Sequence, residues 1–157
     1  MSTHAGHIRL ACAPETAYAL ISDITATDRS PICIGGDWDN PDNGPAVGAW
    51  FTGHNREGDR SWSTRCQVEV ASPGREFTFV MCGLVGRANS EKVARWSYLL
   101  TPVSGGTEVT ESWECLPAYL ELAHLGAHLP TAKRMAADGI PLTLANLKRE
   151  AENSDKG

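Results

Sequence analysis

One carboxylate of this sequence lies where an alternating pattern calls for an apolar side chain. In the segment Thr107–Cys115, Val109, Glu111 and Trp113 share one face of a predicted strand, and polar residues occupy the other face. The apolar face of such a strand packs on the core. A carboxylate there must be paired, hydrogen-bonded or protonated, and burial raises its pKa. Glu111 is therefore a candidate general acid or base, although structural hydrogen-bond networks also bury glutamates.

Further candidates lie on the segment Ala49–Asn55, where both faces of a predicted strand carry an aromatic residue. Phe51 and Asn55 share one face, and His54 lies on the other. We expect the Phe51 face to point inward, because Gly53 leaves room on it for a ligand or a helix. An inward Asn55 could orient a ligand carbonyl or hydroxyl, whereas an inward His54 would be the better acid–base candidate. Alternation alone leaves both alternatives open.

Aromatic residues form the third signal. Trp62, Trp96 and Trp113 fall on predicted inward faces, and Tyr98 follows two residues after Trp96 on the same face. Aromatic walls suit flat, apolar ligands, and indole N–H and phenol O–H groups supply the few polar contacts that such sites need. Filling of the core is the alternative interpretation of each. The candidate ligand-binding residues are Phe51, Asn55, Trp62, Phe79, Trp96, Tyr98 and Trp113.

Other chemistries find little support in the sequence. His124 and His128 have the spacing of two metal ligands on a helix, but only Glu121 lies nearby, and a zinc site needs three or four ligands. There is no nucleophile elbow, phosphate-binding glycine loop or HExxH motif. The five cysteines are scattered without a C-x-x-C motif, which is typical of small buried hydrophobic residues. We therefore expect neither a metal nor a cofactor.

Length and charge narrow the class of protein. The 157 residues are typical of one domain, and 19 acidic against 14 basic residues give a net charge of −5. Without a basic surplus, the composition argues against a nucleic-acid partner. No apolar run approaches the ~18 residues of a membrane span, and Met1–Gly6 lacks the apolar stretch of a signal peptide. We expect a cytoplasmic protein, monomeric or homodimeric, with a frayed tail at 153–157.

Periodicity indicates the elements that position these residues. A strand is predicted over His7–Cys12, a helix begins at Pro14, and Ile32–Trp38 carries the signal of a short strand. From Val47 onward the period is two. The predicted strands are Ala49–Asn55, Arg60–Ala71, Glu76–Cys82, Val93–Thr101 and Thr107–Cys115. Because short turns rich in glycine join several of them, these strands should be antiparallel.

The C-terminal part of the chain is expected to be helical. Ala118–Leu129 and Thr131–Glu152 are rich in alanine and leucine, and Pro130 separates them. Pro141 is expected to kink the second helix or to start a new segment. An apolar stripe follows Pro141, formed by Leu144, Leu147 and Ala151. The last helix is thus the best candidate to cover the inner face of the sheet, and a sheet curved around one helix leaves space for a cavity.

This order of elements resembles the helix-grip fold of the START and birch-pollen-allergen superfamily, often called SRPBCC. The segments that carry the resemblance are Ile8–Glu15, Ile21–Ile24, Pro45–Phe51, Gly105–Thr110 and Ile140–Lys148. The most similar branch is that of the bacterial polyketide cyclase/dehydrase and lipid-transport-like proteins. The resemblance implies one α+β domain over 1–157, with a curved seven-stranded antiparallel sheet around a long C-terminal helix and two short helices after the first strand.

For function, the resemblance implies a cavity for a hydrophobic small molecule such as a lipid, a polyketide or an aromatic metabolite. Binding or carriage of that molecule is the leading hypothesis. One alternative is a cyclase, aromatase or dehydratase that uses Glu111, with Asn55 or His54 as a second polar group, and another is a protein-interaction module. Many relatives carry a Tyr-Pro-x-Trp-like run where this chain has Asp28–Ile32, so that wall of the cavity is expected to differ.

Overall fold

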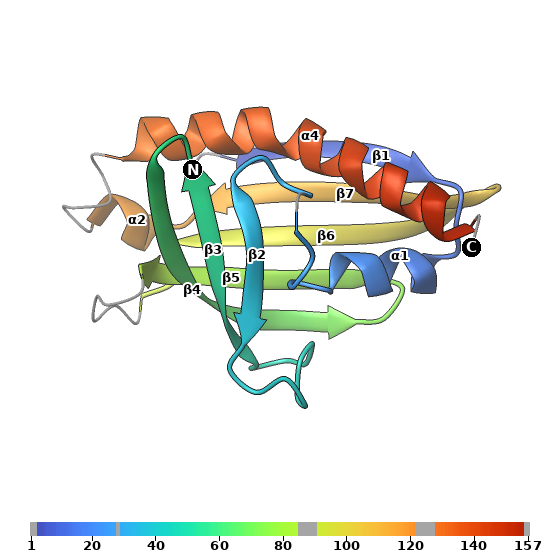
Figure 1. Ribbon diagram of the computed structural model, residues 1–157, viewed down its shortest axis with the longest axis horizontal. Helices are drawn as coiled ribbons and strands as arrows, with labels where there is room; N and C mark the ends of the chain where they lie inside the picture. The colour runs from blue at the N-terminus through green and yellow to red at the C-terminus, as the bar shows by residue number, and fades with distance from the viewer. Residues whose placement is uncertain (1–2, 28, 85–90, 122–127, 156–157) are drawn as a thin grey trace.

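Seven antiparallel strands form one curved sheet in the order β1-β7-β6-β5-β4-β3-β2. The computed structural model describes residues 3–27, 29–84, 91–121 and 128–155. The strands are β1 (Thr3–Leu10), β2 (Cys33–Trp38), β3 (Trp50–Glu57), β4 (Arg60–Ser72), β5 (Glu76–Leu84), β6 (Ala94–Val103) and β7 (Gly106–Cys115). The helices are α1 (Pro14–Ile21), α2 (Pro117–Glu121) and α4 (Leu129–Asp155). Figure 1 shows the strands curving beneath α4, which confirms the predicted helix-grip fold.

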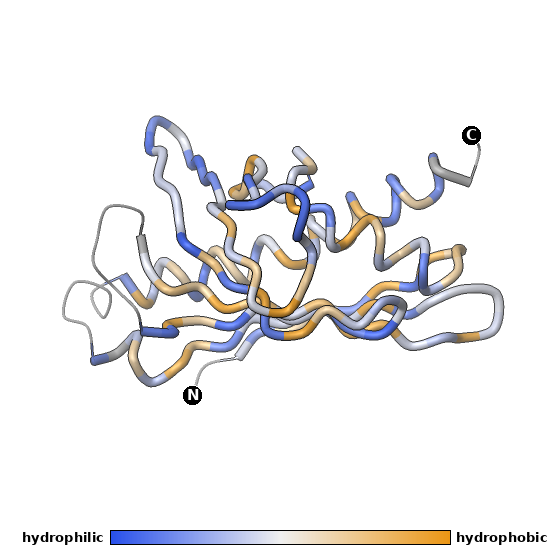
Figure 2. Tube along the Cα trace, turned by 90° about the horizontal axis from the view of Figure 1, so that it is seen from below, coloured by the Kyte–Doolittle hydropathy of each residue, from blue (hydrophilic) through white to orange (hydrophobic). Residues whose placement is uncertain are grey.

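The strands predicted from alternation agree with the structure to within a few residues, except for β1. This strand begins at Thr3 rather than at His7, because it pairs along its whole length with β7, from Thr3 opposite Glu114 to Leu10 opposite Thr107. Pairing with an inner strand thus extends a polar N-terminal segment whose own pattern is weak. Figure 2 shows hydrophilic and hydrophobic residues alternating along the strands, as expected of a sheet with one solvated face.

The second short helix expected after the first strand is absent from the described residues, in which α1 is the only helix between β1 and β2. Helix α1 ends at Ile21, and 22–27 form turns and irregular structure. The Ser22 hydroxyl donates to the carbonyl of Tyr18 at 2.8 Å, and the Thr25 N–H donates to the Asp23 carboxylate at 3.1 Å. Such local side-chain bonds satisfy the backbone groups that a longer helix would use.

Helix α4 is longer and more continuous than the positions of Pro130 and Pro141 in the sequence predicted. It begins at Leu129, so Pro130 lies in its first turn, where a missing N–H breaks no helical hydrogen bond, and does not separate two helices. Pro141 lies inside the helix and starts no new segment. In Figure 1 the second half of α4 slopes away from the line of the first half, as expected of a bend near a proline.

The core lies between α4 and the concave face of the sheet. Leu144 and Leu147 are buried in one cluster with Leu10 of β1 and Val109 of β7, as the apolar stripe predicted. The approach of the helix depends on Gly6, because a Cβ atom there would lie 2.9 Å from Cγ2 of Ile140. A residue without a side chain therefore lets α4 pack directly on β1.

Gly106, at the start of β7, offers a test of the close packing at this end of the sheet. A Cβ atom there would collide with the carbonyl oxygen of Leu10. We expect Gly106→Ala to lower the free energy of unfolding by about 1–3 kcal/mol, because the backbone of β1 must move. Urea unfolding followed by circular dichroism measures this.

The matched control is Gly139→Ala in α4, where the nearest atom to the added Cβ is Cγ of Pro31 at 3.9 Å. Alanine is favoured over glycine inside a helix, so this change should raise stability by about 0.5–1 kcal/mol. Equal effects of the two substitutions would contradict the close approach of β1 and β7 at Gly106.

Candidate functional site

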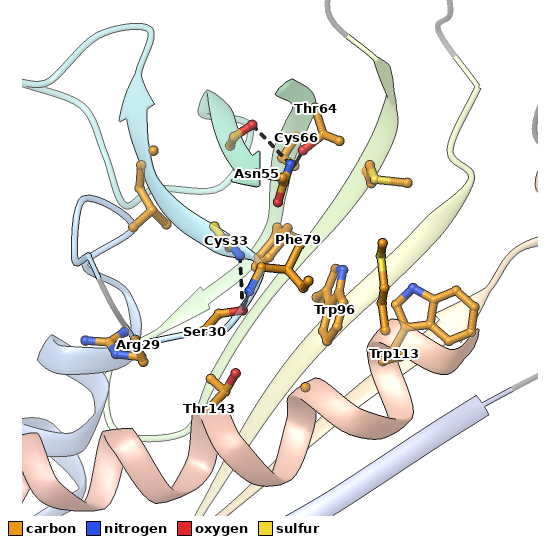
Figure 3. Close-up of a pocket in the computed structure, with 18 of the residues that line it drawn as sticks. Arg29, Ser30, Cys33, Asn55, Thr64, Cys66, Phe79, Trp96, Trp113 and Thr143 are labelled. Atoms are coloured by element: carbon orange, nitrogen blue, oxygen red, sulfur yellow. Dashed lines mark hydrogen bonds between the residues drawn. The ribbon is translucent and has the colours of Figure 1, made fainter. Parts of the chain in front are cut away.

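A partly open cavity of about 430 Å³ lies between the concave face of the sheet, α4 and the segment that joins α1 to β2. Its volume falls within the range of small-molecule sites, and most of its wall is apolar. Figure 3 shows Phe79, Trp96 and Trp113 along one side and Thr143 of α4 opposite them. The cavity can therefore hold a flat, apolar molecule against an aromatic wall.

All eight residues predicted as site residues lie on the wall of this one cavity. They are Phe51, Asn55, Trp62, Phe79, Trp96, Tyr98, Glu111 and Trp113. They come from β3, β4, β5, β6 and β7, and the alternation along each strand turns them toward the same side. Their part in binding or catalysis stays a prediction.

The structure decides between the two faces of β3. Phe51, Gly53 and Asn55 face the cavity, and Phe51 is only 4% exposed. His54 lies on the outer face, where its Nε2 is 2.7 Å from a carboxylate oxygen of Asp37. Asn55 is thus the polar residue that β3 offers to a ligand, and the alternative of an inward His54 is wrong.

Glu111 is the buried carboxyl group of this wall. It is 2% exposed, and its Oε2 accepts a hydrogen bond of 2.8 Å from the hydroxyl of Tyr98 on β6. Its Oε1 is buried and has no hydrogen-bond partner in the described part of the chain. Burial raises the pKa of Glu111 to about 7, although the Tyr98 hydrogen bond and the charge of Arg29 act in the opposite direction.

Tyr98 and Glu111 lie side by side because the register of β6 and β7 makes them direct partners. Burial and the neighbouring carboxyl group raise the pKa of Tyr98 well above its usual value, so its hydroxyl keeps its proton. On the other side of Glu111 the register partner is Gly6 of β1, the residue that lets α4 come close. The carboxyl group is therefore shielded from water but adjoins the cavity.

Arg29 is a cavity residue that the sequence pattern did not single out. Its guanidinium donates two hydrogen bonds to the carboxylate of Glu150 on α4, at 2.7 and 3.1 Å, and its carbonyl accepts one from Asn146 at 2.6 Å. These bonds fix the segment before β2 against α4. The only signal in the sequence was that Asp28–Ile32 departs from the expected aromatic run, and the structure places Arg29, Ser30 and Ile32 in this wall, while Asp28 is outside the described residues.

The thiols of the wall are poor nucleophiles. Burial raises the pKa of Cys66 to about 12, and burial also raises the pKa of Cys33. Cys66 is 3% exposed and belongs to the main core cluster. The interpretation of Cys66 as a small buried hydrophobic residue fits this environment, whereas Cys33 is only half-buried.

Of the predicted histidine pair, His124 lies outside the described residues. His128 borders the cavity near the start of α4. Across residues 3–27, 29–84, 91–121 and 128–155, no group of three or more His, Cys, Asp or Glu side chains could hold a metal ion. Among the same residues, no helix has the length and hydropathy needed to cross a membrane.

Comparisons with known proteins show the family to which this chain belongs. The sequence model of the family described as polyketide cyclase / dehydrase and lipid transport matches residues 3–152. A polyketide-cyclase-like protein of Corynebacterium glutamicum, solved by NMR, is 34% identical, with 98% of this chain and 93% of that chain covered and a TM-score of 0.65. A comparison with curated proteins gave no match.

More distant structures share the fold. The di-domain ARO/CYC protein StfQ of the steffimycin biosynthetic pathway is 16% identical, with 99% of this chain but 52% of that chain covered, and a TM-score of 0.69. A Mesorhizobium loti protein is 15% identical, with 98% and 99% of the two chains covered and a TM-score of 0.63. At these identities the likeness concerns the fold alone.

Proposed function

Because the chain belongs to the polyketide cyclase/dehydrase and lipid-transport family, we propose that it binds a hydrophobic small molecule in the cavity between the sheet and α4. The observation that carries the proposal is the wall itself. Tryptophan and phenylalanine rings line a space of about 430 Å³ whose wall is mostly apolar in area, although charged and polar residues also border it. This is the composition of sites that take flat, apolar molecules and orient them through a small number of hydrogen bonds.

Acid–base catalysis on the bound molecule is the second candidate function. A carboxyl group with a pKa of about 7 gives and takes protons at neutral pH, and Glu111 has such a pKa on the wall of the cavity. Tyr98, which donates to Glu111, would hold that side chain in position, and Asn55 would orient the substrate from β3. A cyclase, aromatase or dehydratase needs such a proton donor or acceptor beside a ring system.

A role as a protein-interaction module has less support. Such a module needs an exposed apolar patch. Large apolar side chains that are exposed in the described part of the chain are Val47, Leu99 and Leu142, and they lie in separate segments. The cytoplasmic location expected from the sequence stays a prediction.

Native mass spectrometry of the chain purified from the organism that makes it tests the binding proposal. We expect an added mass that is released on denaturation and that extracts into organic solvent. The matched control is Ala132→Trp, made in the same cells, because Ala132 lines the cavity from α4 and an indole there would occupy the space. This variant should fold and should lose the added mass.

Two results would contradict the proposal. One is that the purified protein carries no small molecule and binds no compound from an extract of the same cells. The other is an added mass that the Ala132→Trp variant retains, since the molecule would then lie elsewhere. If the extracted compound is converted by the unmodified chain but not by Glu111→Gln, the catalytic candidate replaces simple binding.

A further inference from the structure

Three polar side chains form a hydrogen-bonded row on the outer face of the sheet, and none of them lines the cavity. Asp37 of β2, His54 of β3 and Ser63 of β4 come from three neighbouring strands (Figure 1). Nε2 of His54 is 2.7 Å from Oδ2 of Asp37, and its Nδ1 is 3.0 Å from Oγ of Ser63. A carboxylate, an imidazole and a hydroxyl are thus connected in the order found in the catalytic triads of serine hydrolases.

The register of the strands holds this row in place. His54 and Ser63 are direct partners in the pairing of β3 with β4. On β2 the partner of His54 is Gly35, which has no side chain, and Asp37 lies two residues further along that strand. The imidazole therefore lies between a hydroxyl from one strand and a carboxylate from another, and each of its ring nitrogens meets a different group.

The carboxylate of Asp37 determines which ring nitrogen of His54 can act as a base. A carboxylate accepts hydrogen bonds and has no proton to donate, so the proton of neutral His54 lies on Nε2, next to Asp37. Nδ1 is then left with its lone pair toward the hydroxyl of Ser63. A serine whose hydroxyl donates to an imidazole nitrogen can lose its proton to that nitrogen as its oxygen attacks a carbonyl carbon.

We propose that Asp37, His54 and Ser63 form a second reactive site, in which Ser63 takes the acyl group of a small ester. Oγ of Ser63 bonds to the carbonyl carbon of the ester, and its proton passes to Nδ1 of His54. That proton then goes to the departing alkoxide, so the alcohol leaves and acyl-Ser63 remains. A water molecule, deprotonated by the same nitrogen, attacks the acyl group, the carboxylic acid leaves, and the proton returns to Oγ of Ser63.

The exposure of these side chains sets the class of substrate and the size of the effect. The side chains of His54 and Asp37 are 42% and 79% exposed, so a small ester can reach them directly from water. On so exposed a face, water stabilises the negative charge that develops on the ester oxygen, whereas one donor of an enclosed oxyanion hole adds about 10²–10³-fold. General-base catalysis itself contributes about 10²–10⁴-fold. We therefore expect reaction with activated esters, such as p-nitrophenyl acetate, and not with amides.

Incubation of the full chain with p-nitrophenyl acetate, followed by acid quenching and peptide mass mapping, tests the proposal. We expect release of p-nitrophenol and a transient acetyl group on Ser63. Ser61 is the control within the same molecule, because it is an exposed serine of the same strand whose register partner is Arg56 and not a histidine. Ser63 should be acetylated at least about tenfold faster than Ser61.

Substitutions then separate the roles of the three residues, and circular dichroism of each variant confirms that it is folded. Ser63→Ala should remove most of the release of p-nitrophenol, and His54→Gln should slow the acetylation of Ser63 by about tenfold or more. Asp37 is a positioning residue that acts through His54. In Asp37→Asn the amide can donate to Nε2, which places the imidazole proton on Nδ1, so acetylation should slow by a similar factor, whereas Asp37→Glu should restore part of the rate.

Three results would overturn the proposal. If Ser61 and Ser63 of the unmodified protein are acetylated at the same rate, His54 does not activate Ser63, and this comparison needs no variant. If Ser63→Ala still releases p-nitrophenol at the full rate, with the acetyl group on His54, the imidazole reacts alone. If Asp37→Asn reacts as fast as the unmodified protein, Asp37 does not orient the imidazole. All three results leave the binding proposal for the cavity untouched, because the row lies outside its wall.

Discussion

Replacement of Phe77 by alanine should produce the largest loss of stability among the substitutions considered. Phe77 has no exposed surface, and its ring meets the edge of Tyr18 from α1 at 6.3 Å and the ring of Phe79 at 5.9 Å. It joins the helix to the centre of the sheet. Removing a buried phenylalanine ring of this kind lowers the free energy of unfolding by about 3–5 kcal/mol. Urea unfolding at neutral pH measures the change.

Phe79→Ala is the matched control, two residues further along β5. Phe79 also contacts another ring, that of Phe51 at 5.1 Å, but it is only half-buried because one side of it faces the cavity. Its truncation should therefore cost less stability than that of Phe77, yet weaken the binding of an apolar ring compound more. Phe77 also borders this cavity but has no exposed surface, so equal losses of stability would contradict the difference in burial between the two rings.

The stability of the protein should depend on pH through Glu111. Its pKa rises from about 4.5 in the unfolded chain to about 7 in the folded protein, so the folded state holds this proton more tightly. The stabilisation is fully present below the unfolded pKa and is lost as the pH rises through the folded pKa. Relative to Glu111→Gln, the unmodified protein should lose about 2–3 kcal/mol between about pH 5 and about pH 8.

The comparison with Glu111→Gln isolates this group from the other carboxylates. Asp39, for example, has its pKa lowered by the hydrogen bonds from Arg65, and its contribution is lost as the pH falls. That effect is the same in both proteins and cancels in the difference. Urea titrations of both proteins across this range give the result, and parallel pH profiles would show that Glu111 ionises in the folded protein as it does in water.

The sequence was most informative where one residue type broke a regular pattern. Strict alternation in Thr107–Cys115 predicts an inward Glu111, and the structure confirms that position. A two-residue period also located the five strands β3 to β7 within a few residues. These features follow from local geometry, because successive side chains of a strand point to opposite faces.

The periodicity of the sequence could not predict contacts between segments that lie far apart in the chain. Arg29 and Glu150 are 121 positions apart, and no periodicity links them. The pairing of Tyr98 with Glu111 depends on the register of β6 and β7, which the sequence suggested only through the glycine turn between them. Pro130 was also misleading, because it lies in the first turn of α4 and does not separate two helices, whereas Pro141 bends the helix without ending it.

The pairing of β1 with β7 has a consequence for how the protein is made. Strand β1 is synthesised before its partner residues, Thr107–Glu114, which follow about a hundred residues later, and α4 is synthesised after both. Contacts between such distant segments form slowly. Until then β1 is an unpaired strand that could associate with other chains. Its polar residues His4, His7 and Arg9 make β1 a poor template for such aggregation until β7 has been synthesised and can pair with it.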